Sequence, residues 1–259
     1  MDMTRIRALY DRHERREAQA PGFWLETGPR TVRQLSDSGR GDMVLWSDLD
    51  ETCADGAIEG ELAFFRGRGR PFEWKYFSHD RPPDLRDRLA ARGFEIGEDE
   101  AVMVLELSEW RARPDPGQGV EVRRITDPEG LADMVPVLRA VWDEDPTEDV
   151  AEFAGILRDN PGFMSVYIAF VDGRPVSCSR ANFPSSSPFA SLWGGSTLEA
   201  YRGRGIYSAL LEARVGEAIG RGYAYMTIDA LPTSRPIVEK RGFRLLSMSN
   251  PCSFDGGAS

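Results

Sequence analysis

The sequence is poor in the residues that build disulfide frameworks, zinc centres and histidine-dependent active sites. Three cysteines occur in 259 residues, far apart and without a CxxC pair: Cys53, Cys178 and Cys252. Neither disulfides nor a structural zinc site is expected, which is typical of proteins of a reducing cytoplasm. The only histidines, His13 and His79, are expected to be packed or surface residues. A catalytic triad and a His-based metal site are therefore disfavoured.

Long apolar runs are missing as well. The N-terminal stretch is charged throughout and has no apolar h-region, and no later run approaches the roughly 20 apolar residues of a membrane span. We expect a soluble, cytoplasmic protein. The formal net charge of −10 repels nucleic acid and anionic lipid, so neither is expected as a partner. A homodimer is left open.

The remaining composition is that of a folded protein. At 259 residues and 41% apolar content, the chain is long enough for one large or two modest domains. The stretch RARPDPGQG at 111–119 is rich in proline and glycine and separates two apolar-patterned regions. It predicts a linker between domains at 1–110 and 120–259.

Periodicity after the linker predicts the order strand, two helices, three strands, helix, strand, short helix, strand. Asp172-Gly173 separates two strand-like runs and predicts an antiparallel hairpin. The run FASLWGGSTL at 189–198 reads as a strand whose central glycines predict a bulge or a close approach of a ligand. An apolar stripe that starts at Ile206 predicts a helix.

The letters RGRG occur twice in the chain. The copy at 66–69 follows a helical stripe, so it lies where a helix ends, with unpaired carbonyls and a negative dipole end. The copy at 202–205 follows a strand and opens a helix, so unpaired amides and the positive dipole end face the loop. The arginines can add charge-assisted bonds, and the glycines let phosphate oxygens approach the main chain. Only the second copy predicts an anion site.

Two common phosphate motifs do not fit this loop. A P-loop needs Gly-Lys-Ser/Thr, and a dinucleotide fingerprint needs a third glycine where Ser208 stands. The loop, from Arg202 to Tyr207, instead resembles the pyrophosphate loop of the GCN5-related N-acetyltransferases (GNAT family), Arg/Gln-x-x-Gly-x-Gly/Ala, and departs from it at the last position. EKRGF at 239–243 is similar to the closing signature of that family. The resemblance covers roughly residues 120–255.

The first half resembles part of the same fold. The order helix, Arg-Gly, strand, short helix, Arg-Gly-Phe occurs at 54–94 and again at 206–243. The resemblance implies an α/β (α+β) fold of two GNAT-like domains, each a mixed, mostly antiparallel sheet flanked by helices, with an incomplete N-terminal copy. The stretch before residue 54 carries carboxylates in place of the glycine loop. We therefore interpret this copy as degenerate, as in tandem members of the family.

The family resemblance implies acetyl-CoA as co-substrate, without a metal, and direct attack of a small-molecule or peptide amine on the thioester. Backbone amides near the end of the 189–198 strand would bind the pantetheine arm and polarise the acetyl carbonyl. The implied cofactor-binding residues are Ser196, Thr197, Leu198, Arg202, Gly203, Arg204, Gly205, Ile206 and Tyr207.

The resemblance is weaker for the proton-transfer residues. Many family members carry a tyrosine acid just before the Glu-Lys of the closing helix, where this chain has Val238. Tyr207 and Ser234 are the substitute candidates for the acid. Asp229, with Glu199 as an alternative, is the candidate base.

On the acceptor side, acidic residues cluster between the first two helices of the second domain, and the resemblance places this region beside the acceptor. Glu144, Asp145 and the aromatic Trp193 are the candidate acceptor-binding residues, although such a charge run is also typical of a solvated surface. Trp142 and Cys178 are predicted to be buried.

Two alternatives to an N-acetyltransferase stay open. The missing tyrosine and the degenerate first half also fit a catalytically silent acyl-CoA-binding sensor or scaffold. The second alternative is an enzyme that transfers the acyl group to a hydroxyl, or that transfers an acyl chain longer than acetyl. CoA should stabilise the protein in each case, but the silent protein releases no thiol.

Overall fold

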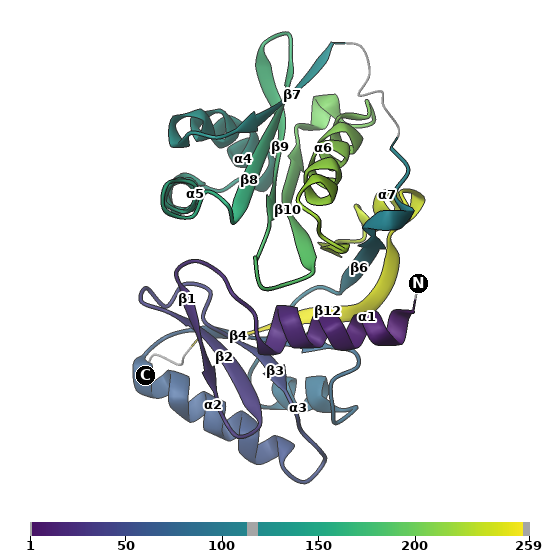
Figure 1. Cartoon of the computed structure of the whole chain (residues 1–259). Coiled ribbons are helices and arrows are strands. Elements are labelled where there is room, and N and C mark those ends of the chain that lie inside the picture. The colour runs from purple at the N-terminus through teal and green to yellow at the C-terminus, as the bar shows by residue number, and fades with distance from the viewer. Residues whose placement is uncertain (1, 113–118, 256–259) are drawn as a thin grey trace. The chain divides into compact units, whose positions relative to one another are not determined.

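A computed structural model describes residues 2–112 and 119–255, and it divides into two compact units (Figure 1). Unit 1 comprises Met1–Met103 and Asp229–Ser259, and unit 2 comprises Val104–Ile228. The chain passes from unit 1 into unit 2 within strand β6 (Glu100–Glu106) and returns within strand β11 (Tyr225–Ala230). Each unit is described by itself.

Unit 1 is a sheet with the order β1-β2-β3-β4-β12, and the short β5 also pairs with β12. The β3–β4 ladder is parallel, and the ladders β1–β2, β2–β3, β4–β12 and β5–β12 are antiparallel. The elements are α1 (Met3–Tyr10), η1 (Asp11–Arg16), β1 (Phe23–Thr27), β2 (Thr31–Ser36), β3 (Met43–Ser47), α2 (Ala54–Arg68), β4 (Phe72–Phe77), α3 (Leu85–Ala91), β5 (Glu95–Ile96), α7 (Arg235–Lys240) and β12 (Arg244–Phe254).

The core of unit 1 lies between its sheet and helices α2 and α3. Alternate residues of β4, among them Phe72 and Trp74, pack against Phe65 of α2, and the Phe65 and Phe72 rings stack with centroids 3.9 Å apart. Helix α2 ends at Gly69, which has φ +63° and donates its amide to the Arg66 carbonyl (3.0 Å). The first RGRG is therefore a helix end, as predicted.

Unit 2 is a sheet with the order β11-β10-β9-β8-β7, antiparallel except for the parallel β10–β11 ladder. The predicted hairpin at Asp172-Gly173 is confirmed, because Val171 pairs with Arg174. The elements are η2 (Leu107–Glu109), β7 (Val120–Ile125), η3 (Pro128–Met134), α4 (Val135–Trp142), α5 (Thr147–Asp159), β8 (Met164–Val171), β9 (Arg174–Asn182), β10 (Phe189–Thr197), η4 (Glu199–Tyr201) and α6 (Ile206–Gly220).

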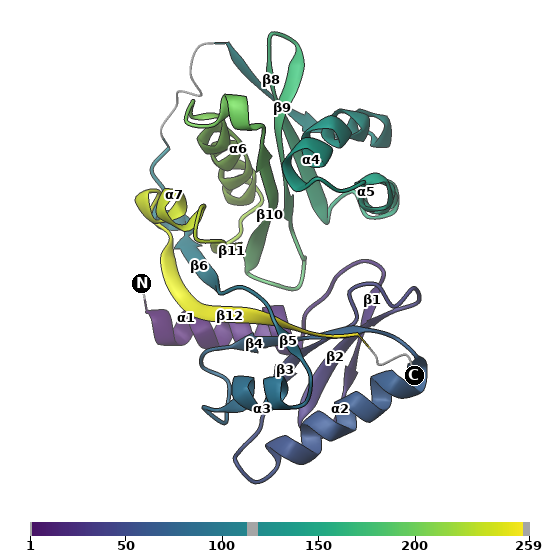
Figure 2. The ribbon, with the colours of Figure 1, turned by 180° about the vertical axis from the view of Figure 1, so that it is seen from behind.

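Helices cover both faces of the unit 2 sheet, with α4 and α5 on one face and α6 on the other (Figure 1, Figure 2). Strand β8 shows why: Val166, Ile168 and Phe170 pack with α4 and α5, and the alternate residues Tyr167 and Ala169 pack with α6. Each unit is thus a mixed, mostly antiparallel sheet with helices, so the predicted fold class is confirmed.

The two units divide the chain differently from the predicted domains. Strand β12, predicted as part of the second domain, pairs with β4 of unit 1 from Ser249 opposite Phe77 to Phe254 opposite Phe72. Hydrogen-bond partners of a strand do not follow from its own sequence pattern, so this pairing was not predictable. Most of the predicted linker, 113–118, lies outside the described residues. Domain boundaries at 1–110 and 120–259 stay a prediction.

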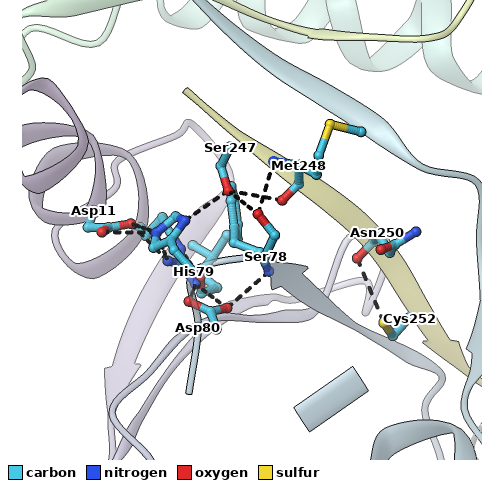
Figure 3. Close-up of polar contacts among 11 residues, drawn as sticks. Asp11, Ser78, His79, Asp80, Ser247, Met248, Asn250 and Cys252 are labelled. Carbon is cyan, nitrogen blue, oxygen red and sulfur yellow. Dashed lines mark hydrogen bonds and ion pairs between the residues drawn. The ribbon is translucent and has the colours of Figure 1, made fainter. Parts of the chain in front are cut away.

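A polar cluster in unit 1 surrounds His79, in the turn after β4 (Figure 3). His79 Nδ1 lies 2.8 Å from Ser247 Oγ, and Nε2 lies 3.1 Å from Asp11 Oδ1. A serine and an aspartate therefore lie within hydrogen-bonding distance of one histidine, as in a catalytic triad, which the sequence did not indicate. Ser247, however, is 6% exposed, and its hydroxyl also donates to the Met248 carbonyl at 3.0 Å. We interpret the cluster as a structural link between η1, β4 and β12.

No helix in the described part of the chain is long and apolar enough to cross a membrane.

Candidate cofactor and acceptor site

Helix α6 begins with unpaired amides at the second RGRG. Gly203 and Gly205 have φ of +73° and +79°, a conformation that costs other residues about 1 kcal/mol or more. The Arg202 amide donates to the Glu199 carbonyl (3.1 Å), but no hydrogen bond within residues 2–112 and 119–255 uses the amides of 203–208. A Cβ placed on Gly203 would meet nothing within 4 Å. The donors predicted for an anion are available and open.

The two arginines of this loop stay at the surface. Arg202 donates from Nε to the Thr197 carbonyl at 3.2 Å, which ties the loop to the end of β10. The Arg204 guanidinium carbon lies 5.1 Å from the centre of the Tyr201 ring. Both cations therefore flank the open amides, and together these groups fit a diphosphate, which needs N–H donors and positive charge.

The corresponding helix start in unit 1 is closed. Ahead of α2, the Asp50 carboxylate accepts the hydroxyl of Thr52 (2.6 Å) and the amides of Thr52 (2.8 Å) and Cys53 (3.0 Å), and these bonds hold the pKa of Asp50 well below its usual range. The Asp50 carbonyl accepts the amide of Ala54 (3.1 Å). A carboxylate thus occupies the position that phosphate would need. This supports the prediction that the first half does not bind a pyrophosphate.

Strand β10 becomes irregular where its glycines stand. The parallel ladder to β11 covers residues 189–192 only, and the register with β9 shifts between Trp193 and Ser196. The predicted bulge is therefore present, with Gly194 at φ +59°. Beyond Leu192, β10 has no ladder partner on its β11 side among the described residues. At Gly194 and Gly195, which carry no side chains, the main chain of β10 lies between the two faces of the sheet.

The predicted pantetheine-binding residues differ in what they offer. Thr197 and Ser196 belong to β10, and Ser196 Oγ accepts the indole N–H of Trp142 at 2.9 Å. The Leu198 amide donates to the Val176 carbonyl at 3.0 Å. The amide of Leu198 is therefore already used by β9, and the pantetheine-binding roles of Ser196, Thr197 and Leu198 stay predictions.

Tyr207 lies under the bulge on the α6 face of the sheet. A Cβ built on Gly195 would be 3.0 Å from Cε2 of Tyr207, so the ring contacts the main chain of β10 directly. The guanidinium of Arg214, two turns further along α6, lies beside the phenol. Burial raises the pKa of Tyr207, and the Arg214 charge opposes the rise. The phenol is therefore protonated at neutral pH and can donate a proton.

Arg214 is a buried cation that the sequence analysis missed. It is 1% exposed, donates from Nε to the Leu210 carbonyl (3.0 Å) and from Nη1 to the Arg180 carbonyl (3.3 Å), and its Nη2 has no partner in the described structure. Burial lowers its pKa. An arginine buried without a carboxylate is costly and is typical of functional sites. Its spacing of four residues from Leu210 and from Ala218 on the apolar stripe was the available signal.

A pocket lies on the opposite face of the sheet, with a cavity volume of about 200 Å³. Its wall includes Trp142, Glu144, Asp145, Phe153, Arg180 and Gly194. Glu144 and Asp145, two predicted acceptor-binding residues, thus come together, and Trp193 is the neighbour of Gly194. Thr147 Oγ1 (2.7 Å) and Arg139 (3.0 Å) already bond Asp145 and lower its pKa.

Trp142 was predicted to be buried, and this is wrong: the residue is 51% exposed. Helix α4 ends at Trp142, followed by Asp143 at φ +56°. Trp142 continues the apolar spacing of α4, but because the helix ends there, its side chain is not buried against the sheet. Cys178 is fully buried as predicted, and burial raises the pKa of its thiol to about 12.

The other predicted catalytic residues belong to unit 1. Asp229 forms an ion pair with Lys75 (3.1 Å), and the Ser234 hydroxyl donates to the Leu231 carbonyl (3.2 Å). Val238, at the position of the tyrosine in the resembling family, is fully buried. The roles of Asp229 and Ser234 stay predictions. No group of three or more potential metal ligands occurs among residues 2–112 and 119–255.

Comparison with known proteins gives a family match for part of the chain. Residues 129–243 match the model of the acetyltransferase (GNAT) family. This is the family that the sequence resemblance names, and the match covers a little under half of the chain. A search of curated proteins by sequence finds no match. The predicted tandem organisation with a degenerate first half stays a proposal.

Solved structures share the fold over nearly the whole chain. A GCN5-related N-acetyltransferase from Kribbella flavida is 13% identical with a TM-score of 0.70, and the match covers 99% of this chain and 96% of that one. A tandem GNAT protein from the clavulanic acid biosynthesis pathway is 14% identical (TM-score 0.63; 94% and 86% covered). A GCN5-related N-acetyltransferase from Sphaerobacter thermophilus is 13% identical (TM-score 0.63; 90% and 82% covered). At these identities the likeness shows the fold alone.

Proposed function

We propose that the protein is an acetyl-CoA-dependent N-acetyltransferase that acetylates a small-molecule or peptide amine in unit 2. The open amides of residues 203–208 carry this proposal, because they provide the diphosphate site that CoA requires. Gly194 and Gly195 connect the two sides of the site: Gly194 lines the pocket, and Gly195 contacts Tyr207. The cysteines form no disulfide among the described residues, compatible with the cytoplasm in which we expect the protein to act.

The residues of unit 2 can perform the transfer without a metal. The amine nitrogen, as the free base, bonds to the acetyl carbon while the carbon–sulfur bond breaks, and the sulfur gains a proton as the nitrogen loses one. Tyr207 donates the proton to sulfur, water accepts the proton that the nitrogen loses, and water then reprotonates Tyr207. The charge of Arg214, held against the phenol, stabilises negative charge that develops there. Asp229 and Ser234 stay candidate participants.

The proposal is tested with the purified full chain, acetyl-CoA and a panel of primary amines. We expect CoA to raise the unfolding temperature and at least one amine to release free thiol with formation of its acetamide. Stabilisation by CoA without thiol release from any amine would favour the silent sensor or scaffold. No stabilisation at millimolar CoA would contradict the diphosphate site.

Replacing Tyr207 with phenylalanine should lower kcat by about 100-fold, the usual contribution of one general acid. The dissociation constant for CoA should stay within about twofold, because the phenol donates only during the reaction. Steady-state kinetics and calorimetry measure the two quantities. Tyr201→Phe, which removes a phenol from the same end of α6, is the matched control. An unchanged kcat in Tyr207→Phe would exclude Tyr207 as the acid.

A further inference from the structure

Arg180 places a positive charge in the wall of a pocket whose other charged residues are acidic. It belongs to β9 and faces α5, with its guanidinium carbon 4.5 Å from the centre of the Phe153 ring and 5.5 Å from that of Trp193. Its Nε lies 3.8 Å from where a Cβ on Gly194 would stand. Two aromatic rings therefore hold the guanidinium beside the glycine segment at which acceptor and thioester would meet.

The guanidinium has no polar partner in the described part of the chain. Among residues 2–112 and 119–255, no side chain or carbonyl forms a hydrogen bond or ion pair with it, and the bond to Arg214 uses the main-chain carbonyl of Arg180 instead. Burial lowers the pKa of Arg180, while the charges of Glu152 and Asp149 oppose the change. A planar set of N–H donors thus lies half-buried in the pocket wall between two aromatic rings, an arrangement that suits a bidentate oxyanion.

The rest of the pocket suits the opposite charge. Glu144, on the turn between α4 and α5, and Asp149, in the first turn of α5, line it together with Arg180. Asp145 contributes less, because Thr147 and Arg139 already bond its carboxylate. A ligand with an ammonium group alone would leave Arg180 unpaired, and a ligand with an anionic group alone would face the carboxylates. One small molecule that carries an ammonium group and an anionic group would pair with the carboxylates and with Arg180.

We propose that Arg180 binds an anionic group of the acceptor, so that the acceptor is a small amine with a carboxylate or phosphate a few bonds from its nitrogen. That the bound amine is acetylated rests on the proposed function, but that Arg180 binds its anionic group does not. The cavity of about 200 Å³ limits the acceptor to about the size of an amino acid or a small phosphorylated amine.

Equilibrium binding of matched ligand pairs, measured by calorimetry on the full chain without acetyl-CoA, tests the inference. The pairs are free α-amino acids against their carboxamides, and ethanolamine phosphate against ethanolamine. We expect the wild type to bind the anionic member of one pair at least about 10-fold more tightly, since a charge-assisted bidentate contact is worth about 1.5 to 3 kcal/mol. The pair that shows the preference identifies carboxylate or phosphate as the recognised group.

Variants separate Arg180 from general electrostatics. Arg180→Gln should remove the preference and leave binding of the neutral member within about twofold, and Arg180→Lys should retain part of it. Arg174→Gln, which removes an exposed arginine from the start of the same strand, is the matched control and should behave as wild type. Thermal unfolding checks that each variant is folded.

The outcomes distinguish this inference from the proposed function. Equal binding of both members of each pair by the wild type, no binding of any, or an unchanged preference in Arg180→Gln would overturn the inference. If thiol is released but anionic amines react no faster than their neutral partners, in wild type and Arg180→Gln alike, the acetyltransferase stands and the inference fails. If anionic amines bind through Arg180 but no thiol is released, the inference stands and the acetyltransferase fails.

Discussion

Replacing Gly205 with glutamate is expected to weaken CoA binding by at least about 100-fold, which corresponds to about 2.7 kcal/mol. The new carboxylate stands at the first residue before α6, among the amides of 203–208 that have no partner in the described structure. It can accept those amides itself, as Asp50 does ahead of α2, and it repels a diphosphate. Gly205 also has φ +79°, so any side chain adds strain of about 1 kcal/mol to the loop.

Gly216→Glu is the control for this variant. Gly216 lies in the same helix, is exposed, and a Cβ placed on it would meet nothing within 4 Å. The substitution adds the same charge to α6 away from its N-terminus and should leave CoA affinity within about twofold. Calorimetric titration with CoA measures affinity, and circular dichroism confirms the fold. If Gly205→Glu binds CoA as Gly216→Glu does, the diphosphate site is elsewhere.

The sequence was sufficient for features that depend on local chemistry. The hairpin at Asp172-Gly173, the helix end at Gly69 and the helix start after Gly205 each follow from glycine at a positive φ beside a periodic apolar pattern. The bulge beside Gly194 was likewise predictable from the glycines of that strand. For this reason the open amides before α6 were predictable from the sequence.

Features that depend on distant partners were not predictable. Strand β12 reads as any half-buried strand, and nothing in its letters indicates that it pairs with β4. Arg180 and Arg214 interrupt apolar patterns, but only the packed structure shows that their guanidinium groups lack carboxylate partners. Trp142 has the spacing of a core residue, yet its exposure is decided by where α4 ends. The acceptor side of the site consists mainly of such residues.

Replacing Asp80 with alanine should destabilise unit 1 by about 3 to 5 kcal/mol, the usual cost of removing one partner from a buried ion pair. Arg15 is 2% exposed, and its Nη2 donates to both carboxylate oxygens of Asp80 at 2.8 Å. Asp80 also accepts the amide of Phe77 at 3.1 Å. The variant leaves Arg15 with Asp11, the Leu45 carbonyl and a 3.4 Å contact to His79 Nε2, so a charge stays buried with fewer bonds.

Chemical denaturation followed by circular dichroism measures the loss, and Glu17→Ala is the control. The Arg12–Glu17 pair has a similar distance, 3.0 Å, but its side chains are 62% and 54% exposed, so its removal should cost less than about 1 kcal/mol. The double variant Arg15→Met with Asp80→Leu should recover much of the loss, because both charges leave together. A loss in Asp80→Ala no larger than in Glu17→Ala would mean that water reaches Arg15, and that the link from η1 to the turn after β4 does not depend on this pair.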